Sequence, residues 1–378
     1  MNATIDLHRS GQSLWLDNIT RELLTSGLLE RYIRELSVTG LTSNPTIFDH
    51  AIRTGSAYDA AIRKRLRAGR EGERLFFDLA LDDITWAADL FRDVHERTAG
   101  VDGWVSLEVS PLLAHDAVAT LAQARELHAR AARPNVLIKI PGTAEGLPAI
   151  EEAIFAGVPV NVTLLFSPAQ YVAAAEAYLR GVERRIEANL NPNVASVASL
   201  FISRWDVAVA DRSPPALPNT LAIAIGRSAY RAYTEKLASA RWHRALNAGA
   251  RPQRLLFAST GTKDPQAPDI LYVKALNAPL TVNTVPESTL RAFADHGELS
   301  ADWASKDTES DRVLEGFRRV GVDVDALARR LQDEGAAAFI ASWNDLLAVI
   351  ATKIALLRER RPPSRARKSS SASRGNSR

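Results

Sequence analysis

Short runs of apolar and β-branched residues recur along this chain of 378 residues, and a longer amphipathic segment follows most of them. This alternation is typical of βα units around a parallel sheet. An open doubly wound sheet usually has fewer strands and a Gly-rich first turn, which is missing here. We therefore predict an α/β fold, a (β/α)₈ barrel of the TIM-barrel type with additional helices at 52–98 and after 286. The predicted strands are residues 13–18, 36–42, 104–110, 135–141, 158–166, 194–202, 254–260 and 280–285.

Three of the intervening segments show clear helical periodicity, at residues 19–36, 112–131 and 167–188. No long linker rich in Pro, Gly or Ser divides residues 1–357, so we expect them to form a single barrel with C-terminal helices. Residues 358–378 are rich in Ser, Arg and Pro and have no apolar periodicity, so we expect a disordered basic tail.

Composition excludes several kinds of chemistry. The chain has no cysteine, which rules out disulfides, thiolate zinc sites and a cysteine nucleophile. Its seven histidines lack the spacing of metal ligands, so we predict no metal. The N-terminus does not read as a signal peptide, and no stretch approaches about 18 apolar residues, so we expect a cytoplasmic protein with no membrane partner.

The charge of the chain is unevenly placed. Residues 358–378 hold eight Arg or Lys against one Glu, whereas the whole chain has a net charge of +3, so residues 1–357 are mildly acidic. We therefore expect no specific nucleic-acid partner. The alternative is weak binding of a phosphate backbone by the tail, which would depend strongly on salt.

Polar side chains stand near the end of almost every predicted strand. In a barrel of this kind the active site is built at the C-terminal ends of the strands, so these residues are the candidates for function. Single Thr and Asn residues are nevertheless often turn or capping residues. The candidates are Asp17, Thr42, Asn44, Glu108, Lys139, Asn161, Thr163, Ser199, Arg204, Ser259, Lys263 and Asn283.

Lys139 lies within the apolar run VLIKIP, where an ammonium group must be paired or must face the barrel mouth. The chain has eight lysines against 39 arginines, so a lysine in such a run indicates chemistry that arginine cannot perform. A desolvated lysine can attack a carbonyl carbon and form a Schiff base. A buried ion pair is the alternative, and Lys274, within LYVKALN, is a rival with similar neighbours.

A Schiff-base lysine needs carboxylates to move protons. Asp17 and Glu108 lie on the first and third predicted strands, close enough to converge with Lys139. We expect Asn18 to cap the following helix, which leaves Asp17 available. The pair at residues 82–83 falls in a helical pattern and is interpreted as an exposed face.

The loop ASTGTKDP at 258–265 combines backbone N–H groups, hydroxyls and a cation that could hold a phosphate. Arg204, just after the sixth predicted strand, could add a bidentate contact. The segment is not a P-loop, and loops of this composition are common, so the pattern is weak by itself.

Seven segments together resemble the transaldolase family, in its longer bacterial branch. The resemblance runs from about residue 14 to about 297 and extends through the C-terminal helices to 358. The segments occur in the family's order and spacing, which is far more specific than any single one. They are residues 41–48, 104–111, 135–150, 160–167, 195–206, 258–265 and 281–290.

The resemblance implies a metal-free Schiff-base enzyme of the non-oxidative pentose phosphate pathway that needs no cofactor. It would transfer a dihydroxyacetone unit between sedoheptulose 7-phosphate and glyceraldehyde 3-phosphate, giving erythrose 4-phosphate and fructose 6-phosphate. Lys139 matches the Schiff-base lysine, and Asp17 the acid/base for the substrate C4 hydroxyl. Glu108 matches a carboxylate that works through a water, which Thr163 helps to hold.

The remaining matches concern substrate binding. Asn44 and Asn161 match groups that hold substrate hydroxyls, with Thr42 and Ser199 nearby, and Arg204 and Ser259 match phosphate contacts. The better-known short branch has an Arg two residues after that Ser, where this chain has Gly261, and Lys263 is the expected substitute. Sugar phosphates are the expected partners, and the protein is expected to be a monomer or a homodimer.

Three alternatives stay open. A Schiff-base aldolase that releases dihydroxyacetone would use nearly the same residues. A non-catalytic barrel that binds sugar phosphates would not need the amine of Lys139. An RNA-associated protein would depend on the tail at 358–378.

Overall fold

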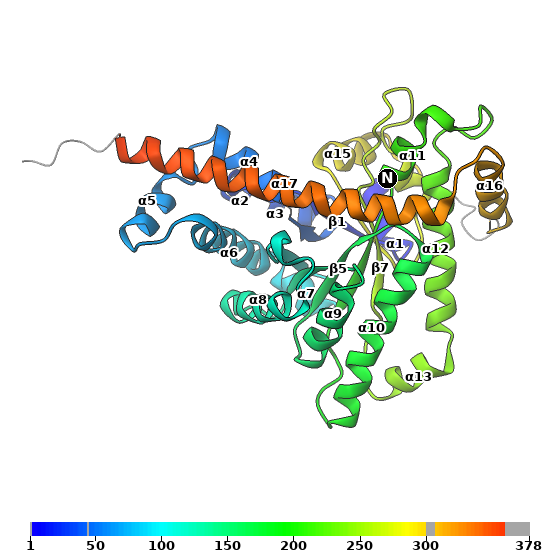
Figure 1. The fold of residues 1–378 in the computed structure, drawn as a ribbon, viewed down its shortest axis with the longest axis horizontal. Helices are drawn as coiled ribbons and strands as arrows, with labels where there is room; N and C mark the ends of the chain where they lie inside the picture. Colours follow the sequence, from blue (N-terminus) through cyan, green and yellow to red (C-terminus); the bar gives the residue numbers. More distant parts are fainter. Residues whose placement is uncertain (1, 44, 300–306, 360–378) are drawn as a thin grey trace, which may run out of the picture.

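The computed structural model describes residues 2–43, 45–299 and 307–359, and its centre is a closed barrel of eight parallel strands in sequence order (Figure 1). The first and last strands pair with each other, Leu14 opposite Asn283, which closes the sheet. This confirms the predicted (β/α)₈ barrel. The strands are β1 (Ser13–Asp17), β2 (Val38–Thr42), β3 (Trp104–Glu108), β4 (Val136–Pro141), β5 (Val160–Leu165), β6 (Ser196–Phe201), β7 (Arg254–Ala258) and β8 (Val282–Val285).

Helices surround the sheet, and the additional helices expected at 52–98 and after 286 are present. The first part of the chain contributes α1 (Ala3–Arg9), α2 (Arg21–Thr25), α3 (Leu28–Glu35), α4 (Pro45–Thr54), α5 (Asp59–Arg67), α6 (Gly72–Leu90), α7 (Arg92–Arg97), the 3₁₀ turn η1 (Pro111–Leu113) and α8 (Ala117–Ala131). The rest contributes α9 (Gly146–Phe155), α10 (Pro168–Glu187), α11 (Arg204–Ala208), η2 (Ala210–Arg212), α12 (Leu221–Leu237), α13 (Ala240–Asn247), α14 (Leu271–Ala275), α15 (Glu287–His296), α16 (Asp307–Arg319) and α17 (Val324–Glu359).

The helix predicted over 19–36 is in fact two helices, α2 and α3. Gly27 lies between them with φ of +72°, a left-handed conformation that interrupts an α-helix. The expected cap was also wrong, because the Thr20 side chain accepts the N–H of Leu23 and caps α2. Asn18 instead donates from Nδ2 to Glu287 Oε2 at 3.3 Å.

The segment predicted as one helix over 112–131 is likewise divided, into η1 and α8. Asp116 caps α8 by accepting the N–H of Ala119 at 2.9 Å, so the helix starts one turn later than its apolar pattern indicates. The helix predicted over 167–188 agrees closely with α10, where Ser167 and Gln170 form a capping box.

Asp83 contradicts the expectation that residues 82–83 form an exposed face. Its side chain is buried, accepts from Arg21 Nη2 and from Tyr58 Oη, both at 2.7 Å, and ties α6 to α2 and α5. Burial raises the pKa of Asp83, and the guanidinium of Arg21 opposes that shift.

The interior of the barrel has its own apolar cluster, near the N-terminal ends of the strands. The indole of Trp15 fills much of this space, and a Cβ added at Gly40 on β2 would lie only 2.5 Å from that ring. Only glycine therefore fits at position 40. The cluster consists of Trp15, Trp104, Leu137, Val197, Leu256, Ala258 and Val282.

Helix α17 extends for 36 residues, roughly 54 Å, across the end of the barrel where the strands terminate (Figure 1). It is long and apolar enough to cross a membrane, which corrects the expectation that no stretch has this character, but such helices also occur in protein cores. It packs against α4, α6 and β5, although only 28% of its most apolar 18-residue window is buried. It ends at Glu359, two residues past the predicted boundary, and residues 360–378 lie outside the described residues.

Candidate active site

A cavity of about 380 Å³ opens at the C-terminal end of the barrel, beneath α17. Predicted site residues from six strands or the loops that follow them face it, as the barrel architecture requires. These are Asp17, Thr42, Lys139, Thr163, Ser199, Arg204, Ser259 and Lys263.

Lys139 and Glu108 are direct neighbours across the pairing of β3 with β4. Lys139 Nζ lies 4.0 Å from Glu108 Oε2 and donates to the backbone oxygen of Ser43 at 2.7 Å. Both residues are buried, 7% and 6% exposed. Burial raises the pKa of Glu108; the nearby ammonium of Lys139 opposes this shift, and the carboxylate of Asp17 adds to it.

Asp17 stands at the end of β1, where Thr42 on the neighbouring strand fixes its orientation. Thr42 Oγ1 donates to Asp17 Oδ1 at 3.1 Å and lies 2.9 Å from Thr284 Oγ1. Asp17 affects the pKa of Glu108 by charge repulsion, so the two carboxyl groups share one site. The convergence expected from strand order is therefore present.

Asn161 lies opposite Lys139 in the register of β4 with β5. It donates to Ser106 Oγ at 3.1 Å and accepts from Ser199 Oγ at 2.7 Å. Asn161 is thus fully buried within a hydrogen-bond chain that ends at Ser199 in the cavity wall. Asn283 lies on β8, where its Oδ1 accepts from Thr260 Oγ1 at 2.8 Å.

The end of β5 is irregular next to Thr163. Leu164 has φ of +59°, an unfavourable conformation for a branched side chain, and the register with β6 shifts at this point. Gln332 of α17 stabilises this bulge, because its Nε2 donates to Leu164 O at 2.8 Å and to Gly142 O at 3.1 Å. Thr163 Oγ1 is buried and has no hydrogen-bond partner among the described residues.

Cationic side chains gather on the β6 and β7 side of the cavity. Arg204 begins α11, and Lys263 lies in the loop after β7; both also line an adjoining cavity together with Arg330 of α17. A Cβ at Gly261 would lie 3.0 Å from Pro286 Cγ, so a larger side chain there would press against that ring. A side chain at position 261, where the short branch has arginine, would therefore require the ring of Pro286 to shift slightly.

Several functional candidates were missed by sequence reasoning. Gly335, Ala338, Phe339 and Ser342 of α17 line the cavity, as do Thr46 and Ile47 of α4. The sequence patterns of α4 and α17 indicate only amphipathic helices. No feature of the sequence near α17 predicts that this helix lies over the mouth of the barrel. Of the predicted residues, Asn44 lies outside the described residues.

Lys274 does not share the site. It lies on α14, 44% exposed by its side chain, and forms an ion pair of 3.4 Å with Glu298. Of the two candidate lysines, only Lys139 reaches the cavity at the C-terminal end of the barrel.

A buried lysine and two carboxyl groups lie together at the C-terminal end of the strands of a closed (β/α)₈ barrel. This arrangement defines the protein as a (β/α)₈-barrel enzyme. Residues 14–350 match the family model described as Transaldolase/Fructose-6-phosphate aldolase. The chain belongs to this family, and it is an enzyme of the transaldolase type.

Relatives that align with nearly the whole chain are also transaldolases. A transaldolase of Thermobifida fusca is 46% identical over 358 residues, covering 92% of this chain and 97% of the relative. A transaldolase of Acidothermus cellulolyticus is 43% identical, with 94% of this chain and 98% of the relative covered. A transaldolase of Thiobacillus denitrificans is 44% identical, with 93% of this chain and 100% of the relative covered.

Proposed function

We propose that this protein transfers a dihydroxyacetone unit between a ketose phosphate and an aldose phosphate, through a Schiff base on Lys139. The observation that carries the proposal is the buried amine of Lys139, 4.0 Å from the carboxyl of Glu108 and in one site with Asp17. The proposed substrates are sedoheptulose 7-phosphate and glyceraldehyde 3-phosphate, which interconvert with erythrose 4-phosphate and fructose 6-phosphate in the pentose phosphate pathway.

The first proposed step joins enzyme and sugar. The amine of Lys139 adds to the C2 carbonyl of the ketose phosphate, and the resulting carbinolamine loses water to give an iminium ion. Glu108, whose pKa is raised by burial, supplies the proton that the departing hydroxyl takes. Glu108 Oε2 and Thr163 Oγ1 are both buried without a hydrogen-bond partner among the described residues, which favours a bridging water between them.

Cleavage follows once the iminium ion is formed. Asp17, oriented by Thr42, takes the proton of the C4 hydroxyl as the C3–C4 bond breaks. The electron pair of that bond moves into the iminium group, the aldose phosphate leaves, and a three-carbon enamine stays on Lys139. Asn161 and Ser199, already joined by a hydrogen bond, are proposed to hold its hydroxyl groups. The reverse steps with a second aldose phosphate complete the transfer.

Transfer prevails over release only when water reaches the iminium ion slowly. Helix α17 crosses the barrel mouth and lines the cavity with Gly335, Ala338 and Phe339, which supports transfer over an aldolase reaction. The test incubates the protein with fructose 6-phosphate, with and without erythrose 4-phosphate. We expect sedoheptulose 7-phosphate to form with the acceptor and little free dihydroxyacetone without it. Equal release of free dihydroxyacetone in both reactions would instead identify an aldolase.

Lys263 and Arg204 are proposed to bind the phosphate group, with Ser259 beside them and Arg330 as an additional cation. Replacing Arg204 or Lys263 by Met removes a charged donor, so we expect KM for fructose 6-phosphate to rise by about tenfold or more in each variant. The Arg330→Met variant shows whether α17 contributes. Cleavage of fructose, which has no phosphate, serves as the reference reaction. A proportional loss with fructose would contradict the phosphate assignment.

Two further features of the protein remain proposals. A chain without cysteine fits the reducing cytoplasm, where we propose that it acts. We also propose that the protein is a monomer or a homodimer.

A further inference from the structure

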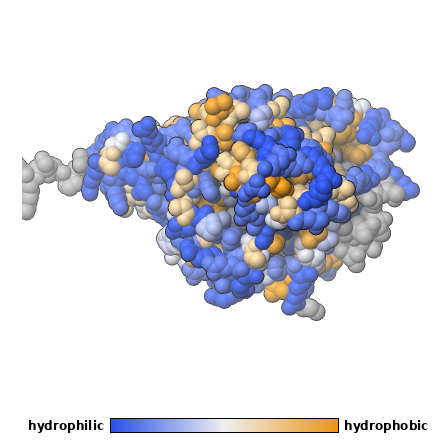
Figure 2. All heavy atoms as spheres, turned by 90° about the horizontal axis from the view of Figure 1, so that it is seen from below, coloured by the Kyte–Doolittle hydropathy of each residue, from blue (hydrophilic) through white to orange (hydrophobic). Residues whose placement is uncertain are grey.

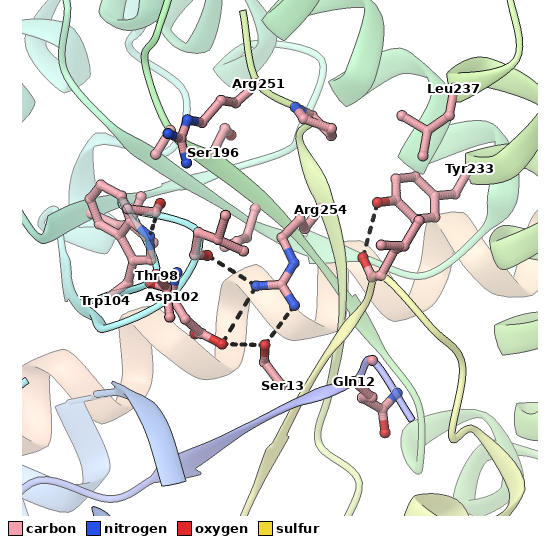
Figure 3. A pocket seen from close by; sticks show the side chains of 18 of the residues that line it. Gln12, Ser13, Thr98, Asp102, Trp104, Ser196, Tyr233, Leu237, Arg251 and Arg254 are labelled. Atoms are coloured by element: carbon pink, nitrogen blue, oxygen red, sulfur yellow. Dashed lines mark hydrogen bonds and ion pairs between the residues drawn. The ribbon is translucent and has the colours of Figure 1, made fainter. Parts of the chain in front are cut away.

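A second cavity, of about 350 Å³, lies at the opposite end of the barrel, where the strands begin (Figure 3). Its lining comes from the starts of β1, β3, β6 and β7, from α12 and from the loop before β8. It shares no lining residue with the candidate active site. Its volume falls within the roughly 300–1,000 Å³ of small-molecule sites. Below we call it the basal cavity.

The walls of the basal cavity are mostly apolar. Trp104, Leu137 and Val197, which belong to the cluster inside the barrel, line it together with Tyr233, Leu237 and Leu280. Leu280 is 61% exposed at the rim. Figure 2 shows the molecule from the side on which α13 lies, and apolar residues gather near the middle of this face. Such walls favour a ligand with a sizeable apolar body.

The charges that line the basal cavity do not cancel. The carboxylate of Asp102 accepts from Trp15 Nε1 at 2.7 Å and from Ser13 Oγ, and it lies 3.8 Å from Arg254 Nη1. Arg254 Nη2 also donates to Ser13 Oγ at 2.6 Å, so this acid and this arginine form one closed network. Asp102 therefore offsets the charge of Arg254 alone.

Arg251 supplies the excess charge. Its side chain is half-buried and extends toward Ser196, on the side of the basal cavity opposite Ser13 (Figure 3). Glu96 lines a neighbouring cavity with Arg251, but no ion pair joins Arg251 to an acid in the part of the chain that the structure describes. Among the arginine, lysine, aspartate and glutamate residues of the lining, two arginines stand against one aspartate, which gives one net positive charge.

We propose that the basal cavity binds a small aromatic carboxylate, with its ring between Trp104 and Tyr233 and its carboxylate on the guanidinium of Arg251. One net positive charge matches a monoanion, and a charge-assisted pair with arginine gives that anion a strong partner. The apolar walls match the ring. A sugar phosphate fits poorly, because its hydroxyl groups would face walls that offer them few hydrogen bonds.

The test titrates the full-length protein with 2-naphthoate by calorimetry and compares 2-naphthylmethanol, which has the same ring system without the charge. We expect one saturable site for the carboxylate and binding about tenfold or more weaker for the alcohol. Arg251→Met should weaken binding of 2-naphthoate by a similar factor. Arg244→Met, which changes an exposed arginine on α13, should leave it unchanged.

A second variant is designed to fill the basal cavity with a larger side chain. Ala195 lines the basal cavity just before β6, and Ala195→Trp should abolish binding while circular dichroism and transfer activity report a folded enzyme. Protein whose Lys139 has been trapped with fructose 6-phosphate and borohydride should still bind 2-naphthoate. Equal affinity for the alcohol, unchanged affinity in the Ala195→Trp or Arg251→Met variant, or competition by fructose 6-phosphate would each overturn the proposal.

Discussion

Lys139→Met is expected to lower kcat for dihydroxyacetone transfer by at least about 10⁴-fold, because methionine fills similar space but cannot form the covalent intermediate. Borohydride with fructose 6-phosphate should label the wild-type protein on the peptide that contains Lys139 and should not label the variant. Among the described residues, the side chain of Lys139 donates a hydrogen bond to Ser43 O and lies 4.0 Å from Glu108 Oε2, so Glu108 is the charged group that loses its neighbour in the variant. A steady-state transfer assay and peptide mapping measure the two effects.

Lys274→Met is the matched control for this experiment. Lys274 lies on α14 with an apolar sequence context like that of Lys139, but it is partly exposed and paired with Glu298. The variant should retain full activity and full labelling. Label on Lys274, or transfer activity in Lys139→Met, would contradict the proposed mechanism.

Glu108→Gln is expected to lower kcat by about 10²- to 10³-fold near neutral pH, as loss of a general acid does. Burial raises the pKa of Glu108, so its protonated form persists to higher pH than that of an ordinary glutamate. The proton available for dehydration of the carbinolamine is present below that raised pKa and is lost as the pH rises through it. Wild-type kcat should therefore fall on the alkaline side of this pKa.

The glutamine variant should lack this alkaline limb, because glutamine does not titrate. Profiles of kcat against pH for both proteins measure the difference, and Glu145→Gln, an exposed change at the start of α9, is the control. An alkaline limb that survives unchanged in Glu108→Gln would assign the titration to another group. Thermal unfolding of both proteins separates a loss of fold from a loss of chemistry.

The barrel and much of its site could be predicted because their signals are local. Each strand is buried and short, so it stands out as an apolar run, and a charged residue within such a run, as at Lys139 or Glu108, is conspicuous. The predicted strands extend up to two residues past the observed ones, as at residues 109–110 after β3 and 259–260 after β7. The strand order of a closed barrel places β3 beside β4, whereas the register that sets Lys139 opposite Glu108 is seen only in the structure.

What was missed depends on contacts between distant parts of the chain. In the sequence, Asp83 is one of two adjacent acids in a helical pattern. Only the fold shows that Arg21 and Tyr58 bind its carboxylate. Nothing in the sequence distinguishes Arg330 from the other arginines. The fold places it on α17, where it lines a cavity with Arg204 and Lys263. The sequence shows a glycine at position 27 but does not show that the helix breaks there, because a single glycine is tolerated within helices at a modest cost.

The position of α17 has a consequence for shortened forms of the enzyme. Helix α17 follows all eight strands in the sequence, and its Gln332 donates to the carbonyl of Leu164 at the end of β5. A variant shortened before residue 324 would keep every strand of the barrel but would lose the side of the cavity that α17 forms above Lys139. We therefore expect such a variant to release more free dihydroxyacetone, relative to transfer, than the full chain does.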